Sequence, residues 1–353
     1  MDIIPEIWRG RRVLITGHTG FKGSWLTCLL NELGAEVVGL SLPLVDFSNS
    51  LYKGAQIQKL LSDEYWIDIR DEQKVDEAVQ NSGVDYVFHL AAQAFVNRSV
   101  KNPLESISTN IIGTTNILIS SLKLDSLKGI TVVTSDKVYQ NLGGGNVPFS
   151  ESDRLGGKDP YSASKAASEL ITHCLSLTCN PYDIPISSAR AGNVLGGGDW
   201  GEDRLVPDLV KSIMSNQILS IRNPNATRPW QYILDCLKGY LLIGQSHINR
   251  ITDTPQSFNF GPRESLPVVE IIRIFERYFD EKFKYVIANS NEHESTSLEL
   301  NSNLATEYLG WQPQFSPIES IKQAADWYIK YTAGADPKEL MLMEIANYRE
   351  GKW

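Results

Sequence analysis

The segment "RRVLITGHTGFKGSWLTCLLNELG" (residues 11–34) decides how this chain can fold. Its first seven residues form an apolar run typical of a buried strand, and residues 23–34 have the pattern of a helix. Between them, Gly17 permits a tight turn, Gly20 lets the backbone approach a pyrophosphate, and Gly23 allows close packing of helix on strand. We therefore predict that this loop and the helix N-terminus bind the phosphates of a dinucleotide.

Further strand-like runs alternate with helix-like segments through the first half of the chain. Apolar runs separated by helices are typical of βαβ units and a parallel sheet. With right-handed crossovers, this pattern predicts an α/β protein with a Rossmann-type, doubly wound parallel sheet. The predicted strands after the first lie at residues 35–42, 65–69, 85–92, 129–135 and 185–192, with a polar helix near 71–81.

After about residue 190 the alternating pattern loosens. Residues 196–204 read as a loop, and amphipathic helices are expected at 204–215, 267–279 and 316–331. We predict a dinucleotide-binding domain over residues 1–190, with a returning segment at about 231–262. A smaller, mostly helical C-terminal substrate domain would comprise residues 191–230 and 263–353.

The composition restricts the classes of partner and location. The 353 residues are 42% hydrophobic and 21% charged, and the net charge is −9 with scattered Lys and Arg, so we expect neither nucleic acid nor a membrane as partner. The four cysteines include no CxxC pair, which predicts reduced thiols and no metal site. The sequence shows no signal-peptide pattern and no apolar stretch of membrane-spanning length, so we expect a cytoplasmic protein.

The adenosine end of the predicted dinucleotide site lacks its usual acid. A carboxylate usually follows the second strand and binds the ribose, but here that strand ends in "GLSLPL" and the nearest acid is Asp46. Ser41 is the alternative ribose contact. This rule therefore leaves the choice between NAD and NADP open. Asp68 and Ile69, after the third predicted strand, are placed to reach the adenine.

A tyrosine and a lysine follow the fifth predicted strand in "DPYSASKAASEL" (159–170). With Asp159 as N-cap and Pro160 at the first helical position, Tyr161 and Lys165 lie one turn apart on one helix face. A nearby ammonium lowers the pKa of a tyrosine, which makes a base for the proton of an alcohol. The alternative is an ordinary solvated helix face.

The fifth predicted strand ends in "TSDKVY" (134–139). Placing Ser135, Asp136 and Lys137 at the end of a buried run is costly unless they face a ligand, and ligands of doubly wound sheets bind at this edge. We predict that Ser135 stands across from Tyr161 and shares the hydrogen bond to a reacting oxygen. The alternative for Asp136 and Lys137 is an ion pair at a solvated strand end.

The glycine loop, Ser135 and the Tyr161/Lys165 pair resemble the extended short-chain dehydrogenase/reductase superfamily, with support from "HLAAQ" (89–93), Asn110 and "NFGP" (259–262). Several longer motifs resemble the branch of the nucleotide-sugar 4,6-dehydratase family that uses CDP-glucose. They are "TGHTGFKGSWL", "TSDKVY", "GGKDPYSASKAASEL", "RAGNVLGGGDWGEDRLVPD" and "ATRPWQ". In that family an Asp and usually a Glu follow the Ser or Thr, and here Lys137 stands where the Glu usually is. The segments "YILDC" (232–236) and "HESTSLELN" (293–301) depart from the family pattern on the substrate side.

The resemblance implies NAD as cofactor and a nucleotide-diphosphate sugar as substrate, with CDP-glucose favoured. It implies that Tyr161 takes the O4 proton while hydride leaves C4, with Lys165 holding the phenolate and Ser135 bonded to O4. Asp136 would protonate the departing C6 hydroxyl. Lys137 would take or relay the C5 proton, which requires a neutral amine or the assistance of a water molecule. Dehydration of GDP-mannose or dTDP-glucose, or a 4-epimerase or reductase activity, are the alternatives.

The resemblance also names contact residues. Those implied for the cofactor are Gly17, Thr19, Gly20, Phe21, Lys22, Gly23, Asp68, Ile69, Leu90, Ala91, Ala92, Tyr161 and Lys165. Those implied for the substrate are Gln93, Asn193, Arg204 and Arg228. The two arginines are candidates for bidentate phosphate contacts, or else form surface ion pairs. Helices near 103–121 and 161–177 would form the interface of a homodimer.

Overall fold

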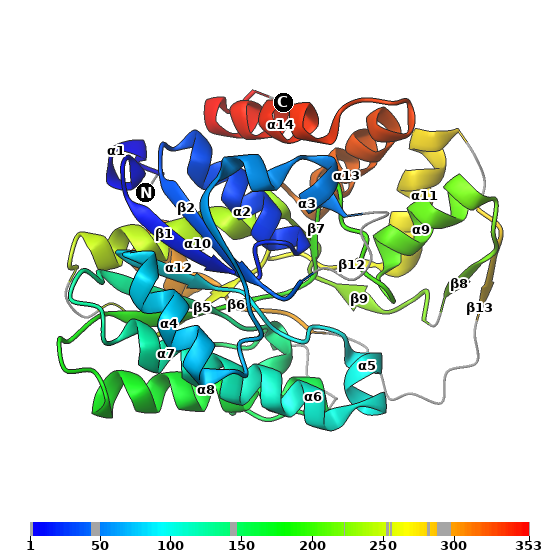
Figure 1. The fold of residues 1–353 in the computed structure, drawn as a ribbon. Helices are drawn as coiled ribbons and strands as arrows, with labels where there is room; N and C mark the ends of the chain where they lie inside the picture. Colours follow the sequence, from blue (N-terminus) through cyan, green and yellow to red (C-terminus); the bar gives the residue numbers. More distant parts are fainter. Residues whose placement is uncertain are drawn as a thin grey trace.

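A seven-stranded, all-parallel sheet forms the centre of the computed structural model, which describes residues 3–43, 50–141, 147–221, 223–251, 254, 256–280, 283–287 and 298–352 (Figure 1). The strand order is β11-β6-β5-β4-β1-β2-β3. The strands are β1 (Arg12–Thr16), β2 (Glu36–Ser41), β3 (Leu61–Trp66), β4 (Tyr86–His89), β5 (Gly129–Val133), β6 (Ile186–Ala191) and β11 (Ser257–Phe260).

Strand β1 is the point where the sheet is wound in both directions. Val13 of β1 is in register with Val37 of β2 on one side and with Tyr86 of β4 on the other. The predicted Rossmann-type, doubly wound sheet is therefore confirmed. The third strand begins earlier than predicted, at Leu61 rather than residue 65. It is the edge strand of the sheet and half-exposed, so it carries polar residues and gives a weak apolar signal.

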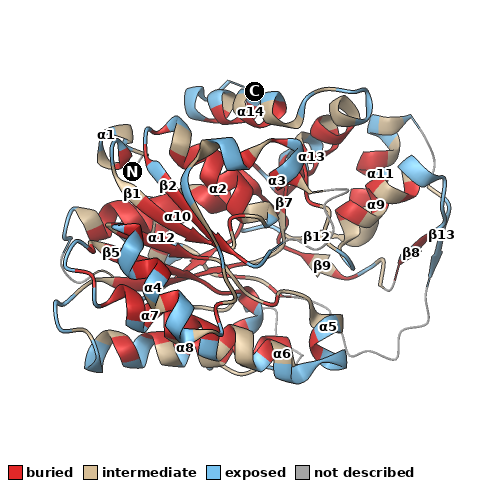
Figure 2. Cartoon of the chain, viewed as in Figure 1, coloured by how far each residue is buried: buried red, intermediate tan, exposed pale blue. Residues whose placement is uncertain are grey.

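Helices cover both faces of the sheet (Figures 1 and 2). Helices α2 (Phe21–Glu32) and α10 (Ile233–Ile248) pack on one face, within the larger hydrophobic core. Helices α4 (Glu72–Ser82), α7 (Thr114–Ser121) and α8 (Pro160–Thr178) pack on the other face, around a second core. The segment predicted to return to the sheet consists of α10 and strand β11.

The remaining chain adds helices and three two-stranded ladders beside the carboxyl edge of the sheet (Figure 1). The ladders pair β7 (Val194–Leu195) with β10 (Gln231–Tyr232), β9 (Thr227–Arg228) with β12 (Leu266–Pro267), and β8 (Leu219–Ile221) with β13 (Tyr285–Ile287). The longer helices are α9 (Leu205–Ser215), α11 (Val268–Phe279), α13 (Pro317–Thr332) and α14 (Pro337–Glu350). The short elements are α1 (Pro5–Trp8), α3 (Leu51–Gly54), η1 (Ile57–Leu60), α5 (Val96–Lys101), α6 (Pro103–Ile107), the π-helix η2 (Ser108–Gly113), η3 (Asp136–Val138) and α12 (Asn303–Leu309).

Buried polar groups fasten the C-terminal helix α14 to the rest of the molecule. The hydroxyl of Tyr232 donates to the carboxyl of Glu344, and the hydroxyl of Tyr348 donates to Asp235 at 2.6 Å. Asp235 also accepts the backbone N–H of Gln314 at 2.7 Å. In the described part of the chain, none of the helices combines the length and apolar character that crossing a bilayer requires.

Candidate active site

A cavity of about 1900 Å³ opens at the carboxyl edge of the sheet, where doubly wound proteins bind ligands. Its walls come from the glycine loop, the ends of β4, β5 and β6, the start of α8, the loop 196–204 and strand β8. A pocket for one small ligand typically measures about 300–1000 Å³. The cavity therefore has room for a dinucleotide and a second ligand together.

The glycine loop has the shape that phosphate binding needs. Gly17 has a φ of +76°, and a Cβ built there would lie 2.9 Å from the backbone nitrogen of Ala91. A Cβ on Gly23 would lie 2.2 Å from the carbonyl oxygen of Gly17. Helix α2 begins directly after Gly20, so its first N–H groups face the cavity. These contacts fit a pyrophosphate resting on the loop.

The walls beside the loop contain the other residues predicted to contact the cofactor. Thr19, Phe21, Lys22, Asp68, Ile69, Leu90, Ala91 and Ala92 all line the cavity. The hydroxyl of Thr16 accepts the N–H groups of Leu90 and Ala91, at 3.2 and 3.1 Å, and so fixes the turn after β4. Asp68 pairs with Arg70, whose hydrogen bond lowers the pKa of the Asp68 carboxyl.

At the adenosine side, Ser41 lines the cavity and its hydroxyl accepts a hydrogen bond from Thr19 at 3.2 Å. Asp46, the nearest acid along the chain, lies outside the described residues. The predicted ribose contact by Ser41 stays a prediction. The combined glycine cradle, helix N-terminus and cavity volume fit a dinucleotide such as NAD.

Helix α8 carries the predicted base and the lysine. As predicted, Asp159 caps the helix by accepting the N–H of Ser162 at 2.9 Å, and Pro160 is the first helical residue. Tyr161 and Lys165 are both buried side chains that line the cavity. The Nζ of Lys165 donates to the carbonyl oxygen of Val133, the last residue of β5, at 3.0 Å.

The predicted effect of Lys165 on Tyr161 is not what the structure shows. Burial raises the pKa of Tyr161 to about 12, against the lowering influences of a hydrogen bond with Ser135 and the charge of Arg204. Burial and the charge of Lys22 lower the pKa of Lys165 to about 8. The sequence spacing could not reveal either effect, because both depend on how deeply α8 packs against the sheet.

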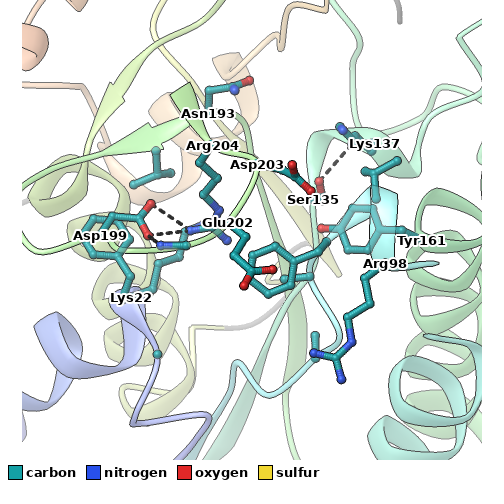
Figure 3. A pocket seen from close by; sticks show the side chains of 18 of the residues that line it. Lys22, Arg98, Ser135, Lys137, Tyr161, Asn193, Asp199, Glu202, Asp203 and Arg204 are labelled. Carbon is teal, nitrogen blue, oxygen red and sulfur yellow. Dashed lines mark hydrogen bonds and ion pairs between the residues drawn. The ribbon is translucent and has the colours of Figure 1, made fainter. Parts of the chain in front are cut away.

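Ser135, Asp136 and Lys137 lie at the end of β5, within the same cavity. Figure 3 shows Ser135 and Lys137 there. The Ser135 hydroxyl accepts the backbone N–H of Lys137 at 3.2 Å and donates to Asp136 at 2.9 Å. Burial raises the pKa of the Asp136 carboxyl, although Lys137 and Ser135 oppose the rise. Lys137 is exposed, so it faces the open part of the cavity. The strand end thus offers a hydroxyl, a carboxyl biased toward its protonated form, and an amine.

Three of the four predicted substrate residues line the cavity, namely Asn193, Arg204 and Arg228. Arg204 is also ion-paired, since its Nη1 lies 2.9 Å from a carboxylate oxygen of Asp199 (Figure 3). Gln93 does not line the cavity. Its side-chain amide donates to Ser106 and to the backbone of Phe95, at 2.7 and 3.1 Å, which indicates a structural role instead.

The structure adds residues that the sequence did not single out. Asp199 holds Arg204, whose guanidinium lies 5.4 Å from the ring centre of Phe95. Asn97 donates to Asp203 at 2.9 Å, which joins the chain after β4 to the loop 196–204. The contacts of Arg204 with Phe95 and of Asn97 with Asp203 link segments about 100 residues apart, so no local motif could identify them. Asp199 is only five residues from Arg204. Among the described residues, no group of three His, Cys, Asp or Glu side chains could hold a metal ion.

The fold is shared with solved enzymes that act on nucleotide sugars. The UDP-glucose 4-epimerase of Thermotoga maritima, solved with UDP-glucose, superimposes with a TM-score of 0.79 at 22% identity, covering 91% of this chain and 99% of that one. The dTDP-glucose 4,6-dehydratase of Streptomyces venezuelae, solved with NAD bound, gives a TM-score of 0.78 at 21% identity over 93% and 99% of the two chains.

The sequence comparisons are more specific. CDP-glucose 4,6-dehydratase of Salmonella typhimurium is 36% identical over 360 residues, which span 98% of each chain. UDP-glucose 4-epimerase of Halalkalibacterium halodurans is 26% identical over 91% of this chain and 97% of its own. The family model described as GDP-mannose 4,6 dehydratase matches residues 14–324. The resemblance inferred from the motifs is thereby confirmed: the chain belongs to the GDP-mannose 4,6 dehydratase family, within the extended short-chain dehydrogenases/reductases.

Proposed function

We propose that the protein is an NAD-dependent CDP-glucose 4,6-dehydratase, which removes water from CDP-D-glucose to give CDP-4-keto-6-deoxy-D-glucose. The observation that carries this proposal is Asp136, a buried carboxyl placed between Ser135 and Lys137 in the cavity that also contains Tyr161 and Lys165. A 4-epimerase needs the hydroxyl, the tyrosine and the lysine, but no further acid and base. The Salmonella relative supports CDP-glucose as the substrate.

The first task of the site is to remove the O4 proton. NAD, when bound, accepts a hydride from C4 of the sugar and returns a hydride to C6. Tyr161, which is buried and lines this cavity, is the group that we assign to take the O4 proton. Ser135 donates or accepts the shared hydrogen bond at O4. We assign to the ammonium of Lys165, which lines the same wall, the stabilisation of the phenolate as it forms, although burial outweighs any such effect on the pKa of Tyr161 in this structure.

The second task is to eliminate water across C5 and C6. A ketone at C4 makes the C5 proton acidic, and Lys137 takes that proton directly or through a water molecule. Burial raises the pKa of Asp136, which favours the protonated carboxyl, and we assign that proton to the departing C6 hydroxyl. Hydride addition at C6 and proton addition at C5 complete the product. The balance is one molecule of water lost from the sugar.

The substrate side of the cavity is assigned by charge and position. We propose that residues 191–230 and 263–353 form the substrate-binding domain and residues 1–190, with 231–262, the NAD-binding domain. Arg228 and Asn193 line the cavity, and we assign them to the diphosphate. Arg204 stays paired with Asp199 and lies near Tyr161, so we assign it to the sugar rather than to the diphosphate.

We also propose that two copies associate through the helices on the outer face of α7 and α8. Exposed apolar side chains occur on α5, α6, η2, α7 and α8, namely Val100, Leu104, Ile107, Ile112, Ile119, Leu170 and Leu177. Exposed apolar side chains that gather on one face are typical of an interaction surface, and we propose that these do so. Four cysteines without disulfides support a reducing, cytoplasmic location.

The test is the mass of the product. The purified protein is incubated with NAD and, separately, with CDP-glucose, dTDP-glucose, UDP-glucose or GDP-mannose. Loss of one water from CDP-glucose alone supports the proposal. Loss of water from another sugar keeps the reaction and changes the substrate. A product of unchanged mass indicates a 4-epimerase and contradicts the roles given to Asp136 and Lys137.

A further inference from the structure

The carboxylate of Glu169 accepts hydrogen bonds on both of its oxygens, close to the proposed catalytic groups. The side chains of Glu169, on α8, and Arg190, on β6, are each only 5% exposed and form a two-pronged ion pair with both N···O distances at 3.0 Å. Two hydroxyls complete the shell. Ser188 of β6 donates to one carboxylate oxygen at 2.5 Å, and Thr134 donates to the other. One carboxylate thus joins helix α8 to the ends of two strands.

The position of Glu169 relates it to the reacting groups. Tyr161, Lys165 and Glu169 are spaced by four residues on α8, so they lie along one face of the helix. The partner of Glu169 on the sheet, Thr134, stands between Val133 and Ser135. Val133 provides the carbonyl that accepts Lys165, and Ser135 provides the hydroxyl near Tyr161. Glu169 therefore holds the strand end one residue away from both contacts.

Arg190 fixes the carboxylate from the other side. Its Nη1 donates to the hydroxyl of Tyr139 at 2.9 Å and to the backbone oxygen of Glu151 at 3.0 Å. Burial opposes the charge of Arg190, but Glu169 outweighs it and the pKa of Arg190 is raised. A buried ion pair is a costly way to join a helix to a sheet, because both charges lose their hydration, and well-packed apolar side chains can join the two elements equally well. The pair is therefore better explained by the direction in which it holds Thr134.

We propose that Glu169 is a positioning residue for the reaction: by holding Thr134, it sets the Val133 carbonyl and the Ser135 hydroxyl against Lys165 and Tyr161. This inference rests on the proposed function, because it takes from it the roles of Tyr161, Lys165 and Ser135. Arg190 serves the same purpose by keeping the carboxylate in place.

The charge of Glu169 has a second effect, on Lys165. Burial and Lys22 of α2 lower the pKa of Lys165, and Glu169 acts in the opposite direction. His89 of β4 also faces Lys165, but burial lowers its pKa to about 3, so its imidazole is neutral at the pH of an assay. Among the described groups that act on Lys165, Glu169 supplies the negative charge. It helps to keep Lys165 protonated.

Two single substitutions separate positioning from stability. Thr134→Val removes the hydroxyl that donates to Glu169 from the end of β5, next to Ser135. Ser188→Ala removes the hydroxyl that donates to Glu169 from β6, a strand that contains none of the proposed catalytic groups. Misplaced reacting groups typically reduce rates on the order of 10- to 100-fold. We expect Thr134→Val to reduce kcat by this factor with KM unchanged, and Ser188→Ala to leave kcat within about twofold, at comparable melting temperatures. Equal kcat values for the two variants would overturn the proposal.

The pH profile tests the charge. Glu169→Gln removes the negative charge and keeps the shape of the side chain. The pKa of Lys165 should therefore fall, and the alkaline limb of the kcat profile should move to lower pH. An alkaline limb that does not move would contradict the proposed effect. If Glu169→Gln does not fold, the Thr134 and Ser188 variants still decide the positioning role. The product of the wild-type protein is identified first. If that product is an isomer rather than a dehydrated sugar, the proposed function fails. The positioning role of Glu169 is then tested by comparing the same variants on the isomerisation, which also needs Tyr161 and Lys165.

Discussion

Lys165 on α8 donates a hydrogen bond to the main-chain oxygen of Val133 on β5, 3.0 Å away. This contact holds the buried ammonium of Lys165 at the end of β5, directly before Ser135 and Asp136. Burial and the charge of Lys22 disfavour the protonated form of Lys165 and lower its pKa to about 8. The proposed reaction needs Lys165 as a cation, so kcat should fall as the pH rises through about 8.

Replacing Lys22 by methionine should move this alkaline limb to higher pH. The charge of Lys22 lowers the pKa of Lys165, and its removal lets that pKa rise toward the ordinary value of 10.5. The measurement is the pH dependence of kcat at saturating substrate and cofactor. Lys211→Met is the matched control, because Lys211 donates to the backbone of Trp200 and is not among the charges that act on Lys165. A limb that moves equally in both variants would contradict the assignment.

Asp136→Asn and Lys137→Met should separate the acid from the base. Without the Asp136 proton, the C6 hydroxyl cannot leave, and dehydration should fall by about 100-fold or more. Lys137 remains able to remove the C5 proton, so CDP-glucose recovered from D₂O should contain deuterium at C5. Lys137→Met should lose both dehydration and this exchange. Exchange that persists in Lys137→Met at the wild-type rate would show that another group is the base.

Glu344→Gln should stabilise the protein at pH 8. Burial raises the pKa of Glu344 from 4.5 to about 8, so the folded protein binds a proton that the unfolded chain releases. Stability from this group is therefore present below pH 4.5 and is lost as the pH rises toward 8. A glutamine can accept the Tyr232 hydroxyl without this loss, and we expect a gain of about 1 kcal/mol or more at pH 8 and none at pH 4.5. Melting curves at the two pH values check this difference, and an equal change at both would contradict it.

Leu104→Glu combined with Leu170→Glu should convert a dimer into a monomer. Both leucines are exposed, on α6 and α8, and charges placed on a shared apolar face oppose association. Light scattering after size-exclusion chromatography measures the mass in solution. Met214→Glu is the control, since Met214 is exposed on α9, away from this face. A monomeric wild-type protein, or a dimer that survives the double substitution, would contradict the proposed interface.

Local signals predicted most of the sheet and the groups proposed for catalysis. Gly17, Gly20 and Gly23 fall within seven residues that cover the turn after β1 and the start of α2, and Tyr161 and Lys165 lie one helical turn apart, as predicted. Contacts between distant segments could not be predicted, such as Arg204 over Phe95. The direction in which Lys165 points and the pKa of Tyr161 depend on burial against the sheet, which spacing does not encode. The position of Glu169 could have been used to predict that it lies near Lys165, because it follows Lys165 by one helical turn.

The central claim is that a hydride taken from C4 is returned to C6 within one active site. CDP-glucose carrying deuterium at C4 tests this claim most directly, with the product analysed by NMR and mass spectrometry. We predict a product that has lost one water and carries the deuterium at C6. Deuterium retained at C4 of an isomer, or released to the solvent, would contradict the proposed dehydratase reaction.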